Sequence, residues 1–176
     1  MTVDGQLPRW EVFKQDASSK AHAAVGSVHA ADAEHALLMA RSVFARRPSA
    51  VSLWLAPRWA VHEFTREQLA EALATPGTQL AAPMRYRVFI KSSDRRSMAA
   101  YEHRGEVVAS GTSAALRAAT PDELPLGVWL VEDAAVIASA PADAEAWFAP
   151  ASDKRYKQQS EYAVSVKRHP ARREGS

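Results

Sequence analysis

The stretch VGSVHAADAEHALLMA, residues 25–40, is matched later in the chain by RGEVVASGTSAALRAA, residues 104–119. Gly26 then aligns with Gly105 inside both blocks. Two further pairs of blocks recur in the same order: WEVF at 10–13 with YRVF at 86–89, and VSLWLAPRWAV at 51–61 with LGVWLVEDAAV at 126–136. Because the offset stays between 75 and 79 residues, the sequence predicts two tandem copies of one unit.

Each copy has the pattern strand, strand, helix, strand. Trp10 and Val12 alternate with Glu11, which is the two-residue period of a strand with one buried face. Asp32 is a suitable N-cap for the helix that follows the second strand of the first copy. Glycine inside a strand often marks a bulge, and both second strands contain one, at Gly26 and Gly105. The sequence therefore predicts an α+β protein made of two ββαβ repeats.

Four segments follow from this reading. They are a first repeat at 9–64, a connecting helix and linker at 65–84, a second repeat at 85–148, and a C-terminal segment at 149–176. The connecting helix begins with a Thr65-x-x-Gln68 capping box and is expected to be exposed. The last segment contains a strand-like YAVSV at 162–166 and a basic, disordered end.

A unit of about 75 residues with three strands and one helix leaves much of its sheet uncovered. Two joined copies can cover each other, which predicts a pseudo-twofold, dimer-like domain within one chain. Further oligomerisation stays open.

Composition narrows the class of protein. The 176 residues contain no cysteine and carry a net charge of +2, so disulfides, thiolate metal sites and thiol nucleophiles are excluded. The charge is uneven, because residues 153–176 hold seven Lys and Arg against three Asp and Glu. No apolar run is long enough to cross a membrane, and a cytoplasmic location is the simplest expectation.

The common catalytic and nucleotide-binding motifs are missing. No Glu-x-x-His or HExxH pattern occurs, so the histidines, including His22, His29 and His35, are expected to be structural or surface residues. Neither GxGxxG nor GxxxxGK[ST] is present, and the serine elbow GxSxG is also missing. We therefore expect no catalytic, cofactor-binding or metal-binding residues, although a site assembled from distant residues stays open.

The tryptophans allow two interpretations. Trp54 and Trp129 occupy equivalent places in the two copies and suit either the core or a protein interface. Trp59 has no aromatic counterpart, because Ala134 stands at its place in the second copy. A nucleic-acid platform would need aromatic side chains on one face, whereas Tyr86 and Phe89 alternate away from each other.

These residues carry a resemblance to a known family. WEVF, HAAVGSVHAADAEHALLMARSVFARR and SLWLA resemble the small B subunit (PaaB type) of ring-1,2-phenylacetyl-CoA epoxidase, the multicomponent oxygenase of aerobic phenylacetate degradation. His22, Gly26, His29 and Asp32 match the family's most specific segment, and WFAP with KRY near Lys154 and Tyr156 match its later part. Ordinary members have one unit, whereas this chain has two.

The resemblance implies a non-catalytic accessory or bridging subunit without cofactors, whose partners are a di-iron catalytic subunit and its structural partner. The surface expected to meet these partners is listed here: Arg46, Arg47, His29, Trp54, Trp59, Trp129, Lys154 and Tyr156. The alternative is a stand-alone nucleic-acid or small-ligand binding module that uses the basic C-terminal region.

Overall fold

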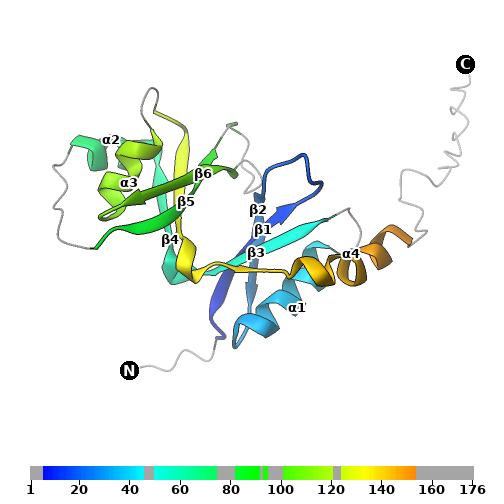
Figure 1. Cartoon of the computed structure of the whole chain (residues 1–176). Coiled ribbons are helices and arrows are strands. Elements are labelled where there is room, and N and C mark those ends of the chain that lie inside the picture. Colours follow the sequence, from blue (N-terminus) through cyan, green and yellow to red (C-terminus); the bar gives the residue numbers. More distant parts are fainter. Residues whose placement is uncertain are drawn as a thin grey trace, which may run out of the picture.

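The computed structural model describes residues 6–45, 50–74, 82–91, 93–94, 101–120 and 124–153. The elements of the first half are β1 (Arg9–Gln15), β2 (Ala23–His29), α1 (Ala33–Phe44), β3 (Ser52–Pro57), η1 (Arg58–Ala60), β4 (Val61–Thr65) and α2 (Arg66–Ala74). Those of the second half are β5 (Met84–Lys91), β6 (Tyr101–Ala109), α3 (Thr112–Ala119), β7 (Gly127–Glu132), η3 (Asp133–Ala135), β8 (Ile137–Ala138), η4 (Pro141–Asp143) and α4 (Ala144–Asp153). The predicted α+β class and the repeated ββαβ order are confirmed (Figure 1). The repeat also continues further than predicted, since a short 3-10 turn, a strand and a helix follow each ββαβ unit.

Local signals in the sequence act as predicted. The carboxylate of Asp32 accepts a hydrogen bond from the backbone N–H of His35 at 2.8 Å and caps α1. The Thr65 N–H donates to Gln68 Oε1 at 2.9 Å at the start of α2, which is one half of a capping box. Gly26 has a φ of 147° beside a bulge in β2, and a Cβ atom at this position would lie 2.7 Å from the ring of Phe44. Glycine is therefore required at this point.

The strands form one sheet in the order β4-β7-β5-β6-β2-β1-β3-β8. If each first-half strand is exchanged for its counterpart, β1 for β5, β2 for β6, β3 for β7 and β4 for β8, the same order is read backwards. The sheet is therefore pseudo-twofold symmetric about the junction of β2 and β6. That junction is short, since the strands pair only at Ala23 and Glu102 and the His103 N–H donates to the His22 carbonyl at 2.8 Å.

The strand that ends each half belongs to the sheet of the other half. β4 leaves the first repeat and pairs with β7 from Val61↔Val131 to Thr65↔Gly127. β8 returns from the second repeat and pairs with β3 at Trp54↔Ala138 and Leu55↔Ile137. The helices travel with these strands, because α2 packs against α3 and Phe148 of α4 packs in the core beneath α1. Each half thus contributes a terminal strand and its helix, β4–α2 or β8–α4, to the other half. We call these two segments arms, and the two halves exchange arms.

Three apolar clusters make the core. The first lies between β1–β3 and α1 with α4, and the third lies between β5–β7 and α3 with α2. The second joins the inner faces of the two half-sheets and includes Phe13 and Phe89, whose rings stack with centroids 4.2 Å apart. These two residues are equivalents in the repeat. The helices consequently lie on the outside and the strands between them (Figure 1).

Two expectations from the sequence were wrong in detail. α2 is exposed along most of its length, as expected, but it is not only a connector, because Leu69 is fully buried against the second repeat. Glu11 is not on a solvent face either, since its side chain has no exposed surface. Both errors have one physical cause: the halves cover each other, so surfaces that would be free in a single repeat are buried. No helix in the described ranges is long and apolar enough to span a membrane.

Candidate functional site

The equivalent tryptophans Trp54 and Trp129 lie at the internal contact between the repeats. Trp129 is 5% exposed and stacks on Tyr101, with centroids 4.6 Å apart. Trp54 stacks instead on His22, with centroids 3.4 Å apart and an interplanar angle of 11°. His22 and Tyr101 are equivalent residues of the two repeats. The stacked pair is therefore repeated, but the ring that stacks on the tryptophan is an imidazole in the first repeat and a phenol in the second.

The other face of Trp54 carries a cation. The Arg87 guanidinium lies 4.0 Å from the Trp54 centroid, and because one face has no room for both groups, Arg87 and His22 occupy opposite faces of the indole. Arg87 Nε also donates to Asp133 Oδ1 at 2.6 Å. This cluster therefore ties strands from both repeats together.

The equivalent of Arg87 in the first repeat is Glu11, a residue of opposite charge. Glu11 Oε1 lies 2.8 Å from Arg9 Nε, and its Oε2 has no hydrogen-bond partner among the described residues. Burial raises the pKa of the Glu11 carboxyl, and the nearby Arg9 partly opposes that rise. Arg58, the equivalent of Asp133, also favours the carboxylate. The charges at these two equivalent positions are therefore reversed between the repeats, but the pairing differs, because Glu11 pairs with Arg9 and Arg58 pairs with Glu63.

Two histidines flank the bridge between β2 and β6. His22 Nε2 is hydrogen-bonded to Ser52 Oγ at 3.0 Å, and the His103 ring meets Trp54 edge-on at 5.2 Å. Burial, followed by the charges of His103 and Arg87, lowers the pKa of His22 to about 4. Burial and then Arg87 likewise lower the pKa of His103. Both rings are thus held neutral at pH 7, which suits packing at the junction.

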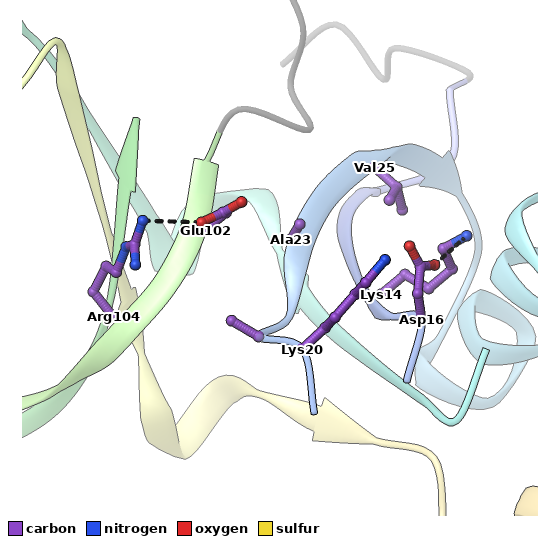
Figure 2. A pocket seen from close by; sticks show the side chains of 8 residues that line it. Lys14, Asp16, Lys20, Ala23, Val25, Glu102 and Arg104 are labelled. Atoms are coloured by element: carbon purple, nitrogen blue, oxygen red, sulfur yellow. Dashed lines mark hydrogen bonds and ion pairs between the residues drawn. The ribbon is translucent and has the colours of Figure 1, made fainter. Parts of the chain in front are cut away.

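A groove opens where β2 and β6 diverge. Its volume is about 660 Å³, and Figure 2 shows Glu102 and Arg104 of β6 on one side and the hairpin of β1 and β2 on the other. The lining residues are Lys14, Asp16, Lys20, Ala21, Ala23, Val25, Glu102 and Arg104. Lys14 pairs with Asp16 at 2.8 Å and Arg104 with Glu102 at 3.0 Å. Lys20 forms no ion pair with any carboxylate that the structure describes, so the groove has an excess of positive charge.

The expected partner-facing residues fall into three groups. Trp54 and Trp129 line the contact between the repeats, while His29 and Trp59 lie on the exterior, with Trp59 70% exposed. His29 Nδ1 is within hydrogen-bond distance, 2.9 Å, of the Leu7 carbonyl. The remaining four, Arg46, Arg47, Lys154 and Tyr156, lie outside the described residues, as does the predicted strand at 162–166.

Other surface and junction residues were missed by the sequence interpretation. Leu38, Met39 and Val43 of α1 are 47%, 38% and 55% exposed. A helical wheel could have found Leu38, which lies opposite the stripe of Ala36 and Ala40, whereas Val43 falls on that stripe and is exposed all the same. The grouping of Arg87 with His22 and His103 had no comparable signal, since these residues are far apart in the chain.

The described residues do not bring three metal-ligating side chains together. A family model described as phenylacetic acid degradation B, PaaB, matches residues 6–79 and 83–169. The chain belongs to the PaaB family. Each matched segment contains one of the two repeats, so the tandem arrangement predicted from the sequence is confirmed. PaaB membership gives this chain a role in phenylacetate degradation. No curated protein and no solved structure matched in the other two comparisons.

Proposed function

We propose that this PaaB-type chain is a non-catalytic subunit that bridges or organises other subunits of a phenylacetyl-CoA epoxidase complex. Its partners in this proposal are the di-iron catalytic subunit and the structural partner of that subunit. A cytoplasmic location follows from the proposal, because the substrates of such a complex are intracellular thioesters.

One observation supports this proposal above the others: the inner faces of the two repeats are buried against each other. The side chains there that have catalytic chemistry are engaged with neighbouring residues: His22 and Glu11 are buried, and Arg87 is half-buried. The outer sheet faces are covered by helices. The exterior and the strand edges are therefore what the fold offers to other molecules.

The residues proposed for this exterior surface include the arginine pair that follows α1 in the sequence, Arg46 and Arg47, because arginine forks suit acidic partner surfaces. Replacing both arginines with Glu should weaken co-purification of the chain with the other oxygenase subunits at least tenfold. The fold should be unchanged by circular dichroism. Assembly at wild-type strength would contradict this surface, and a wild-type chain that binds none of the subunits would contradict the proposed function.

The alternative binding-module function has less support. Tyr86 and Phe89 are both buried and belong to different clusters, so neither can stack on a base. The basic C-terminal region on which this alternative depends lies outside the described residues. RNA or DNA that co-purified with the chain and dissociated steeply with added salt would favour it.

A further inference from the structure

β6 has one strand edge without a partner over most of its length. Its other edge is paired with β5 from Met84↔Ala109 to Lys91↔Tyr101. On the free side, β2 contacts it only at the Ala23–Glu102 bridge and through the His103 N–H. Among the described residues, no strand pairs with this side of Arg104–Ala109. Unpaired N–H and C=O groups on such an edge form a template for another strand.

Every second side chain along this edge is open to solvent, while Val107 and Ala109 pack against the third core cluster. Arg104 and Glu106 are exposed, Val108 is 64% exposed, and no residue of β6 is buried. The pseudo-equivalent strand β2 is more buried, because its Ala24 and Val28 are 0% and 5% exposed. A bulge at Arg104 and nearby charges protect the end of the edge beside the junction. The last three residues of β6 are Val107, Val108 and Ala109, which carry no charge.

The basic groove adjoins the start of the same edge. Arg104 contributes to the groove lining, and Lys20 faces the same space from the β1–β2 hairpin (Figure 2). Three cations and two carboxylates line it, and the carboxylates are paired with Lys14 and Arg104. A chain that continued from the edge into this groove would therefore meet uncompensated positive charge at Lys20.

We propose that the free edge of β6, Arg104–Ala109, binds an extended acidic segment of another protein as an added strand. Main-chain hydrogen bonds to β6 supply the pairing, and carboxylates of the segment lie beside Lys20 and Arg104. The strand predicted from the sequence at 162–166 is a poorer occupant, because residues 153–176 hold seven Lys and Arg against three Asp and Glu. That the segment comes from another phenylacetate-degradation subunit rests on the proposed function, whereas the site itself does not.

A synthetic probe tests the site on the full chain. A capped hexapeptide of alternating Glu and Val is expected to slow hydrogen exchange at the amides of Arg104–Ala109 at least tenfold when saturating. The matching peptide of alternating Lys and Val should bind at least tenfold more weakly. Raising NaCl from 50 to 200 mM should weaken the Glu–Val peptide several-fold. Equal binding of both peptides, or unchanged exchange on β6, would overturn the proposal.

Charge variants locate the contact. The double variant K20E/R104E should lose at least tenfold in affinity for the Glu–Val peptide, and K20Q/R104Q should lose several-fold without introducing new charge. The control R66E/R117E reverses two arginines on α2 and α3 and should stay within twofold of the wild type. Equal losses in the control would refute the groove as the contact.

The same exchange measurement on the assembled complex tests the source of the segment. If the other oxygenase subunits bind through β6, its amides become protected in the complex. A complex that forms while β6 exchanges as in the free chain would overturn a partner strand at this edge. A chain that binds the Glu–Val peptide but no subunit would instead contradict the proposed function and leave the strand site supported.

Discussion

The two halves of this PaaB chain share a backbone plan but differ in the side chains at their contact. His22 stacks on Trp54 in one half, and Tyr101 stacks on Trp129 in the other. Glu11 is a buried acidic side chain where the second half has the cation Arg87. The apolar centre, Phe13 against Phe89, is the same in both. Apolar contacts thus keep the symmetry of the repeat, whereas polar contacts break it.

Separating the halves is the most severe test of the comparison. Residues 1–79 alone would expose the inner face of the first repeat and leave β4 and α2 without the strands on which they pack. We expect this fragment to be unfolded or aggregated by circular dichroism and light scattering. Co-expressed with residues 80–176, it should form a soluble one-to-one complex. A folded, monomeric 1–79 fragment would contradict the exchange of arms.

Truncation of the central aromatic pair should have the next largest effect. Phe13 and Phe89 are 1% and 0% exposed, so F13A and F89A should each lower the free energy of unfolding by about 3–5 kcal/mol. Because the rings touch, the double variant should lose less than the sum of the two. Chemical denaturation measures all three. Strongly unequal single losses would mean that this contact is not symmetric.

Lowering the pH should destabilise the fold mainly through His22, in the first half. The pKa of His22 is about 4 in the fold, against 6.5 for a free histidine, so the unfolded chain binds the extra proton between these values. Stability from the neutral ring is complete above pH 6.5 and falls as the pH drops from 6.5 to 4, by about 3 kcal/mol.

Urea denaturation at several pH values measures this loss. H22Q should flatten the profile, leaving the smaller contribution of His103, whose pKa is also lowered. Exposed His29→Gln is the matched control. An H22Q profile as steep as that of the wild type would assign the acid sensitivity elsewhere.

Neutralising Asp133, the partner of Arg87, and neutralising Glu11 should change the free energy of unfolding in opposite directions. D133N leaves Arg87 without its carboxylate and should cost about 1–2 kcal/mol at pH 7. E11Q removes a carboxylate whose pKa is raised by burial. Its stability at pH 7 should therefore equal or exceed that of the wild type, by up to about 1 kcal/mol. Thermal unfolding compares the two variants directly, and a loss in E11Q as large as in D133N would show that Arg9 fully compensates the buried anion.

Trp59, which has alanine as its counterpart, should matter least for stability. It is 70% exposed, so W59A should change the free energy of unfolding by less than about 0.5 kcal/mol. W129A, in the core, should cost about 3–5 kcal/mol in the same assay. A large loss in W59A would indicate packing that the exposed side chain does not suggest.

The sequence predicted much of this fold because several local rules agreed. The block offset, the alternation in the strands, the Asp32 cap and the strand glycines each led to the observed elements. The exchange of β4 and β8 was not predictable, since both strands are short and a single repeat gives no information about which sheet they join. Alternation also failed at Glu11, because it assumes that one face of the strand meets water.

The candidate sites were harder to predict than the fold. His22, Arg87 and His103 meet only after the two repeats associate, and the groove exists only because β2 and β6 diverge after one bridge. No spacing in the sequence encodes either event. Trp59 and His29, predicted for the partner surface, are both exposed, and for Trp59 the difference between the aligned copies could be read directly from the sequence.

The covalent link between the repeats has a consequence for how the assembly forms. In a pair of identical chains, residues on the axis would meet their own copies, and dilution would separate the partners. Here the second half is always present at a high effective concentration. Folding of this chain should therefore be independent of protein concentration, and each half is free to hold a charge that an identical partner would repel.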